Sequence, residues 1–129
     1  KKALVIGRSR LVGMPQVIMF GSKGVDCTVT LAHSRTKDLD ELISESEIVV
    51  PAIGVPGIIN AKNVKKDAIL LDVGISSDEK GIHGDVDFDS VDGIAKAVTP
   101  MPGGTGPMTV ASLLENTMKA AQLQGIISY

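Results

Sequence analysis

Aromatic side chains and cysteines are almost absent from this sequence. It contains no Trp, one Tyr, two Phe and a single cysteine, Cys27, among 129 residues. Val, Ile, Leu, Ala and Met must therefore fill the interior, as they do in parallel sheets buried between helices. Cys27 has no partner for an internal disulfide, and we expect its thiol to be buried and inert.

The sequence also lacks an excess of charge and any long apolar run. Thirteen Lys and Arg against fifteen Asp and Glu give a net charge of -2, without a basic stripe. With few aromatic rings to stack on bases, nucleic acid is not an expected partner. No apolar run approaches the ~20 residues of a membrane span, and the first residues do not form a signal-peptide core. We expect no membrane partner and a soluble protein that is cytoplasmic, with an organellar location as the alternative.

Short aliphatic runs alternate with helical or polar segments along the chain. A length of 129 residues suits one globular domain. The alternation predicts an α/β fold, a three-layer, doubly wound Rossmann-type domain with a mostly parallel sheet. Its abrupt first strand suggests a domain taken from a longer polypeptide. The predicted strands are residues 3–6, 28–32, 48–51, 68–73 and 94–98.

Three helices are predicted around these strands. The first spans residues 14–20, and Asp38 with Glu41 forms a capping-box pattern that opens the second. The third begins at Gly106-Pro107 and has one apolar face with helical spacing. The residues of that face are Val110, Leu113, Leu114, Thr117, Met118 and Ala121.

The loop from Gly7 to Gly13 has the position of a dinucleotide pyrophosphate site. It connects a strand to a helix, where backbone N–H groups can approach a phosphate. Its spacing departs from G-x-G-x-x-G, because Ser9 replaces the second glycine and the last glycine comes one position late. A plain strand-to-helix turn therefore stays an alternative for this motif.

The segment after the second strand lacks the acidic residue that NAD enzymes use to bind the ribose 2′-hydroxyl. His33, Ser34 and Arg35 stand there instead. Arg35, Ser34 and Arg8 could donate hydrogen bonds to a 2′-phosphate, since an Arg fork matches phosphate oxygens. NADP is therefore preferred to NAD, with an exposed loop that binds nothing as the alternative.

Residues 100–109 contain three prolines and three glycines directly before the last helix. Prolines stiffen such a loop, while glycines let the backbone approach a ligand. We interpret this segment as a ligand-binding loop.

The acidic segment 85–89 resembles the first half of a calcium-binding loop. Ser90 stands where that loop needs Gly and Lys96 where it needs Glu, so calcium binding is rejected. We expect these acids to cap and turn the chain. His83 lacks spaced His or Cys partners, so no metal site is predicted.

Six segments match, in order, those of one enzyme family. They are Gly7-Arg8-Ser9, Val12-Gly13-x-Pro15, His33-Ser34-Arg35-Thr36, Asp72-Val73-Gly74-Ile75, Gly84-Asp85-Val86-Asp87-Phe88 and Pro102-Gly103-Gly104-Thr105-Gly106-Pro107-Met108-Thr109. The chain thereby resembles bifunctional methylenetetrahydrofolate dehydrogenase/methenyltetrahydrofolate cyclohydrolase. The resemblance implies that residues 1–129 are the NAD(P)-binding domain, and that the N-terminal domain with the catalytic lysine and tyrosine is absent.

The resemblance, with the residue patterns above, implies the following sites. No catalytic or metal-binding residue is expected in this chain. The expected cofactor-binding residues are Gly7, Arg8, Ser9, His33, Ser34, Arg35, Ala52, Gly54, Gly74, Ile75 and Thr109. The expected substrate-binding residues are Pro102, Gly103, Gly104, Thr105, Gly106, Pro107 and Met108.

The implied activity is that of an oxidoreductase and hydrolase of one-carbon metabolism and purine biosynthesis. The full enzyme would oxidise 5,10-methylenetetrahydrofolate with NADP and hydrolyse the methenyl product to 10-formyltetrahydrofolate, as a homodimer. This chain alone is expected to be inactive. The alternatives are a stand-alone NADP-binding or regulatory module, and an NAD-linked relative with dehydrogenase activity only. Pro51 and Val55 depart from the family pattern beside the adenosine half of the cleft.

Overall fold

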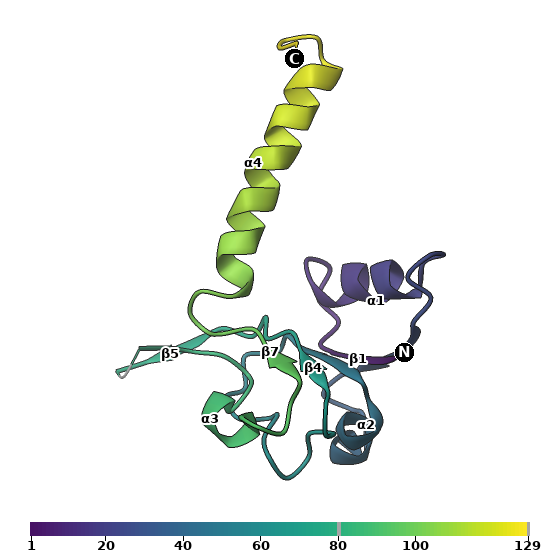
Figure 1. Cartoon of the computed structure of the whole chain (residues 1–129), viewed down its shortest axis with the longest axis vertical. Coiled ribbons are helices and arrows are strands. Elements are labelled where there is room, and N and C mark those ends of the chain that lie inside the picture. Colours follow the sequence, from purple (N-terminus) through teal and green to yellow (C-terminus); the bar gives the residue numbers. More distant parts are fainter. Residues whose placement is uncertain (80, 129) are drawn as a thin grey trace.

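A parallel sheet of five strands forms the centre of the molecule (Figure 1). The structure is a computed structural model and describes residues 1–79 and 81–128. All four strand pairings are parallel, which confirms the predicted α/β class. In spatial order the strands are β2 (Thr28–Ala32), β1 (Lys2–Ile6), β3 (Ile48–Pro51), β4 (Ile69–Leu70) and β7 (Ala97–Val98).

Helices lie on both sides of this sheet. Figure 1 shows α1 (Gly13–Gly21) and α4 (Thr105–Leu123) on one side, and α2 (Leu39–Glu45) and α3 (Phe88–Val91) on the other. The chain therefore changes side at β1, which has β2 and β3 as its neighbours. In doubly wound sheets the ligand crevice lies at such a reversal, outside the carboxyl ends of the strands.

The interior is aliphatic, as the composition predicts. The strand β1 contributes Leu4, Val5 and Ile6, all almost fully buried, and Leu70 of β4 joins them. Cys27 does not belong to this interior, because it precedes β2 and is only half-buried. The expectation of a buried thiol was wrong.

Two strands are shorter than predicted. Towards β3, the backbone N–H groups of Leu71 and Val73 still donate to the carbonyls of Val49 (2.9 Å) and Pro51 (3.1 Å). Towards β7, the N–H of Asp72 donates to the Thr99 side chain (Oγ1, 2.8 Å) and not to a backbone carbonyl. Residues 94 and 95 both donate to the Val91 carbonyl and so complete the turn after α3 instead of joining β7. Pro51 is the last residue of β3, in agreement with its missing donor.

The structure contains a short hairpin that was not predicted, and the N-terminus of α2 differs from the predicted one. Strands β5 (Ser76–Asp78) and β6 (Gly81–His83) pair antiparallel beside the main sheet. The helix α2 exists, but Asp38 at its N-cap has φ 56° and ψ 39°, and its side chain makes no capping bond. An N-cap carboxylate normally reaches the first helical N–H groups from an extended backbone. The backbone of Asp38 is left-handed instead, so the predicted capping box does not form.

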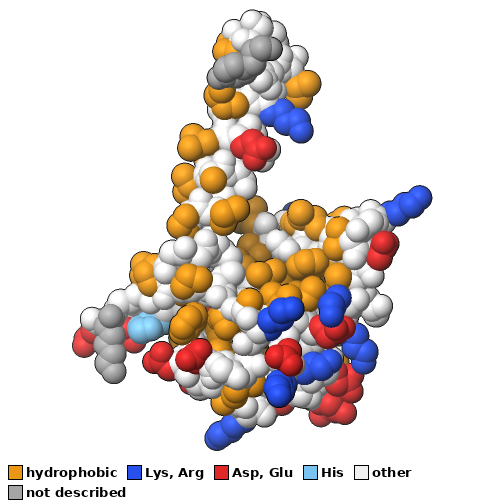
Figure 2. Space-filling model, viewed as in Figure 1, with side chains coloured by type: hydrophobic (Ala, Val, Ile, Leu, Met, Phe, Trp, Pro, Cys, Tyr) orange, Lys and Arg blue, Asp and Glu red, His pale blue; other side chains and the backbone are white. Residues whose placement is uncertain are grey.

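The last helix, α4, forms as predicted but extends away from the sheet (Figure 1). None of its residues, all within the described part of the chain, is buried. Val110, Leu113 and Leu114 are each about 60% exposed, at 59%, 65% and 63%. Figure 2 shows hydrophobic side chains along this helix. Among residues 1–79 and 81–128, no helix is long and apolar enough to span a membrane.

The turn from β1 into α1 depends on close contact between Gly7 and Gly13. A Cβ atom on Gly13 would overlap the Gly7 carbonyl oxygen. Gly7 itself has φ +119° and would bring a Cβ to 2.6 Å from the Ala52 carbonyl oxygen. The two glycines therefore let the loop fold back against the ends of β1 and β3.

Replacing Gly13 by Ala is expected to lower the free energy of unfolding by about 1 to 3 kcal/mol, because the backbone of Gly7 would have to move. Urea denaturation would measure this loss. Gly106→Ala is the matched control, since nothing lies within 4 Å of its Cβ position, and it should change stability by less than about 1 kcal/mol. Equal stability of the two variants would show that the close contact between Gly13 and Gly7 does not restrict the side chain at residue 13.

Candidate functional site

The expected ligand-binding residues all lie at the carboxyl edge of the sheet. Parallel strands bring the loops that follow them to the same edge. Residues 7–9 follow β1, 33–35 follow β2, and 52–54 follow β3. Residues 74–75 follow β4, and the segment 102–109 follows β7. The loop order along this edge is thus set by the strand order.

The loop after β1 caps its own helix. Ser9 Oγ accepts hydrogen bonds from the N–H groups of Val12 (3.1 Å) and Gly13 (3.4 Å), and the Ser9 carbonyl accepts from Met14 (3.0 Å). These are the amides with which a helix N-terminus usually binds phosphate. These amides are already occupied, whereas the Ser9 hydroxyl hydrogen and the exposed Arg8 side chain remain available to an anion.

The segment after β2 forms a tight turn held by His33. The N–H of His33 donates to Thr36 Oγ1 (2.9 Å), and the N–H of Thr36 donates to the His33 carbonyl (2.8 Å). The N–H of Arg35 donates to His33 Nδ1 (3.2 Å). His33 thus has a structural role in the turn, while the Ser34 and Arg35 side chains are exposed and available to a ligand.

The loops after β3 and β4 touch each other. The N–H of Ala52 donates to the Ile6 carbonyl (2.9 Å), and the N–H of Gly74 donates to the Pro51 carbonyl (3.2 Å). A Cβ on Gly54 would lie 3.3 Å from the Ile75 carbonyl oxygen. These bonds bring Ala52, Gly54 and Gly74 together, and leave the Ile75 side chain 67% exposed.

The proline-glycine segment divides between a loop and a helix. Residues 102–104 precede α4, whereas residues 105–109 form its first turns. Thr105 Oγ1 donates to the Asp72 carbonyl (3.1 Å), which joins the start of α4 to the end of β4. Thr109 Oγ1 donates back to the Thr105 carbonyl (2.9 Å) inside the helix.

Two buried aspartates join these loops, a role that their sequence context did not predict for either of them. Asp72 is 2% exposed and Asp85 is 0% exposed. The signal for Asp72 was an acid directly after an aliphatic strand run. Asp85 was expected to cap or turn the chain, which was wrong, because its carboxylate accepts from the N–H groups of Ile53 and Gly54 in a distant loop. Asp87 does cap α3, since its side chain accepts from the N–H of Ser90.

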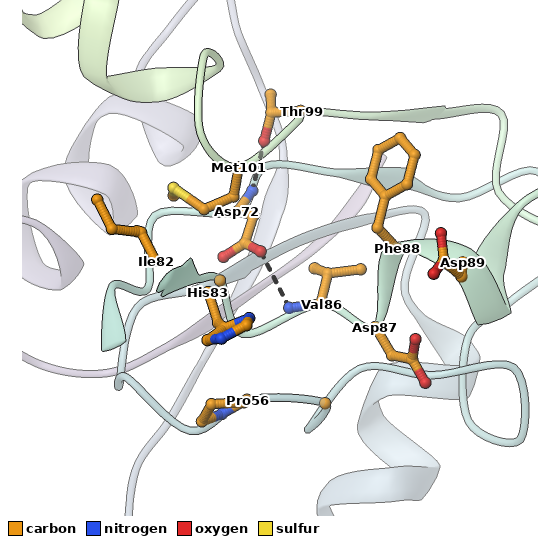
Figure 3. A pocket seen from close by; sticks show the side chains of 12 residues that line it. Pro56, Asp72, Ile82, His83, Val86, Asp87, Phe88, Asp89, Thr99 and Met101 are labelled. Atoms are coloured by element: carbon orange, nitrogen blue, oxygen red, sulfur yellow. Dashed lines mark hydrogen bonds between the residues drawn. The ribbon is translucent and has the colours of Figure 1, made fainter. Parts of the chain in front are cut away.

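A cavity of about 390 Å³ lies beside this edge, between the loop after β3, the hairpin and the end of β7 (Figure 3). Asp72, His83, Phe88 and Met101 are among its lining residues. None of the expected cofactor-binding or substrate-binding residues lines it. In residues 1–79 and 81–128, no cluster of three His, Cys, Asp or Glu side chains could hold a metal ion.

A family model described as the NAD(P)-binding domain of tetrahydrofolate dehydrogenase/cyclohydrolase matches residues 1–125. The chain belongs to this family. The chain is 51% identical over 119 residues to bifunctional protein FolD of Pelagibacter ubique, covering 92% of this chain and 42% of that protein. It is 52% identical over 124 residues to FolD of Lactococcus lactis, covering 94% and 42%. The chain thus spans about two fifths of these relatives.

Solved structures of the family have the same fold. The 5,10-methylenetetrahydrofolate dehydrogenase of the silkworm Bombyx mori superposes with a TM-score of 0.92 at 43% identity, covering 98% of this chain and 46% of that one. The Trypanosoma brucei dehydrogenase-cyclohydrolase, solved with NADP and an inhibitor, gives 0.88 at 34% identity, covering 99% and 45%. The NAD(P)-binding domain expected from the six segments is confirmed.

Within this NAD(P)-binding domain, the Asp72 carboxyl has an unusual environment. Burial raises its pKa above the ordinary value of 3.8; hydrogen bonds from the N–H groups of Asp85 and Val86 oppose that rise, and the Asp85 carboxylate adds to it. The folded protein therefore holds a proton on Asp72 more tightly than the unfolded chain does.

We expect Asp72→Asn to change the pH dependence of stability. The wild type should gain stability relative to the variant as pH falls through the raised pKa of Asp72 towards 3.8, because the folded state binds more protons in that window. Urea denaturation at a series of pH values would measure the difference. Asp89→Asn, at an exposed position in α3, is the control. A difference between wild type and Asp72→Asn that stays constant with pH would contradict this assignment.

Proposed function

We propose that this chain is the NADP-binding domain of an enzyme that oxidises 5,10-methylenetetrahydrofolate to 5,10-methenyltetrahydrofolate and hydrolyses the product to 10-formyltetrahydrofolate. Membership of the tetrahydrofolate dehydrogenase/cyclohydrolase family supports the reaction. The choice of NADP is supported by one feature, the acid-free turn after β2 with its exposed Ser34 and Arg35. The Trypanosoma brucei relative solved with NADP agrees with that choice.

The residues of the carboxyl edge fit such a dinucleotide. Gly7 lets the backbone of the loop after β1 lie against the loop after β3, because a side chain there would strike the Ala52 carbonyl. We propose that the loop of Gly7, Arg8 and Ser9 lies on the pyrophosphate side of the dinucleotide and that Ser9 binds the pyrophosphate. Arg8, Ser34 and Arg35, on the two neighbouring loops, would hold the 2′-phosphate, since charged donors make the stronger hydrogen bonds.

The remaining expected residues continue along the edge towards β4 and β7. Ala52 and Gly54 would border the middle of the dinucleotide, with His33 holding the turn beside the adenosine. Gly74, Ile75 and Thr109 would contact the nicotinamide end, and the loop 102–108 would border both the nicotinamide and the folate. The tight packing of Gly54 on the Ile75 carbonyl supports a continuous surface there.

The bound dinucleotide supplies the hydride acceptor. This domain has the task of orientation: its loops fix the nicotinamide against the methylene carbon of the folate, and small displacements at such a site cost large factors in rate. The hydrolysis step needs a base, which we place in an N-terminal domain outside residues 1–129. The relatives are more than twice as long as this chain, which supports a second domain.

We further propose that the complete protein is a cytoplasmic homodimer whose 10-formyl product supplies purine biosynthesis. A stand-alone binding module is less well supported, because the relatives that the chain matches are bifunctional enzymes. An NAD-linked dehydrogenase is disfavoured by the missing acid after β2.

Calorimetric titration of the 129-residue chain with NADP and with NAD tests the cofactor site directly. We expect NADP to bind more tightly, because only NADP offers a 2′-phosphate to Arg8, Ser34 and Arg35. The titration is done at fixed low salt, since exposed charge interactions are screened by ions. Tighter binding of NAD would overturn the cofactor choice.

Arg8→Ala should weaken NADP binding by about 1.5 to 3 kcal/mol and NAD binding much less, because it removes a charged donor to the 2′-phosphate. Lys23→Ala removes the same charge from an exposed position after α1 and serves as the control, with little expected change. If Arg8→Ala weakened NADP and NAD binding equally, Arg8 would not be a 2′-phosphate ligand.

A further inference from the structure

The two buried aspartates connect every loop proposed to touch the nicotinamide end. The Asp72 carboxylate accepts from the N–H groups of Asp85 and Val86, both at 3.0 Å. Its backbone N–H donates to Thr99 Oγ1 (2.8 Å), and its carbonyl accepts from Thr105 Oγ1 (3.1 Å). Figure 3 shows Asp72 between Thr99 and Val86. Asp72 thus joins the ends of β4 and β7 to the segment that carries Asp85.

Asp85 extends this connection to the loop after β3. Its Oδ2 atom accepts from the N–H groups of Ile53 (2.9 Å) and Gly54 (3.1 Å). Neither N–H belongs to a helix or a strand. The Asp85 carboxylate therefore holds the backbone of Ile53 and Gly54, and Gly54 in turn lies against the Ile75 carbonyl.

The two carboxylates also fix the glycines beside them. A Cβ on Gly74 would overlap the Asp85 carboxylate, and a Cβ on Gly84 would overlap the Asp72 carboxylate. Asp85 thus packs directly on the backbone of Gly74, one residue before Ile75. Its position determines how the loops after β3 and β4 lie relative to each other.

Stability alone does not explain an aspartate at this place. Among the described residues, no donor lies within hydrogen-bond distance of Asp85 Oδ1, although that atom is fully buried. A buried polar atom without a partner costs free energy that a purely structural residue would avoid. The hydrogen bonds that the Asp85 carboxylate accepts from the N–H groups of Ile53 and Gly54, in the proposed cofactor loop, are both made by Oδ2.

We propose that Asp85 is a positioning residue that sets the loop 52–54 against Gly74 for binding of the nicotinamide dinucleotide. This inference rests on the proposed function of the same site. Asp85 does not touch the dinucleotide; it acts through the backbone of Ile53, Gly54 and Gly74. Dinucleotide-dependent steps should therefore depend on it, and the hydrolysis of the methenyl product, which involves no change in oxidation state, should not.

The test uses the full-length protein with Asp85→Ala, Asp85→Asn and the control Asp89→Ala. Dinucleotide binding is measured by calorimetry, the dehydrogenase by its KM and kcat, and the hydrolase with the methenyl substrate alone. We expect Asp85→Ala to raise the dinucleotide Kd and KM at least tenfold, with hydrolysis changed less than twofold. Asp85→Asn keeps an acceptor oxygen for Ile53 and Gly54 and should recover most of the binding. Asp89→Ala should behave as wild type.

Results that differ from these would contradict the positioning role of Asp85. Equal losses in oxidation and hydrolysis would mean that Asp85 only supports the fold, and an unchanged dinucleotide Kd in Asp85→Ala would mean that it positions nothing. If Asp85→Ala does not fold, the dinucleotide affinities of Asp85→Asn and Asp85→Glu decide. Weak dinucleotide binding by the Asn variant together with normal binding by the Glu variant would show that the negative charge at residue 85 is needed and that the exact position of its acceptor oxygen is not, which would overturn the positioning role. A wild type that binds the dinucleotide but does not oxidise the folate would defeat the proposed function, while the binding comparison would still decide the role of Asp85.

Discussion

Parallel pairing of the five strands is the constraint on which the rest of the structure depends. Because all strands run in one direction, every loop that leaves a carboxyl end reaches the same edge of the sheet. Segments far apart in the sequence, such as those of Gly7 and Ala52, thereby become neighbours. The position of β1, between β2 and β3, then places the glycine loop between the loops that follow those two strands.

Two buried carboxylates, those of Asp72 and Asp85, lie at the same edge of the sheet. Burying a carboxylate is unfavourable unless hydrogen bonds replace the lost water. Asp72 receives two such bonds from the backbone, and Asp85 receives two at one oxygen only. The other buried polar side chains among the described residues, Ser46 and Asn63, are uncharged. Buried carboxylates therefore occur here only where they hold the loops of this edge in a defined position.

Much of the fold follows from the sequence, because aliphatic runs of strand length alternate with helical patterns. The five sheet strands and α1, α2 and α4 were anticipated on that basis. The hairpin β5–β6 was not, since residues 76–83 are mostly polar and carry no alternating pattern. The capping box at Asp38 does not form because this residue adopts a left-handed backbone, which the spacing of Asp38 and Glu41 does not indicate.

The candidate site could be predicted in part. Loop residues such as Arg8 and Arg35 are recognisable, since their position after a strand and their chemistry both appear in the sequence. The use of Ser9 as a helix cap depends on a hydroxyl orientation that only the folded loop defines. The contact between Asp85 and Ile53 joins residues that are far apart along the chain, so no local pattern could indicate it.

The reciprocal packing of Asp72 with Gly84 and of Asp85 with Gly74 also restricts how this chain can evolve. A side chain gained at either glycine requires the loss of the carboxylate that faces it, and a lost carboxylate leaves backbone donors buried without an acceptor. Neither position can change first without a penalty. The Asp72-Val73-Gly74 and Gly84-Asp85-Val86 segments should therefore be inherited as one unit, although they are separate in the sequence.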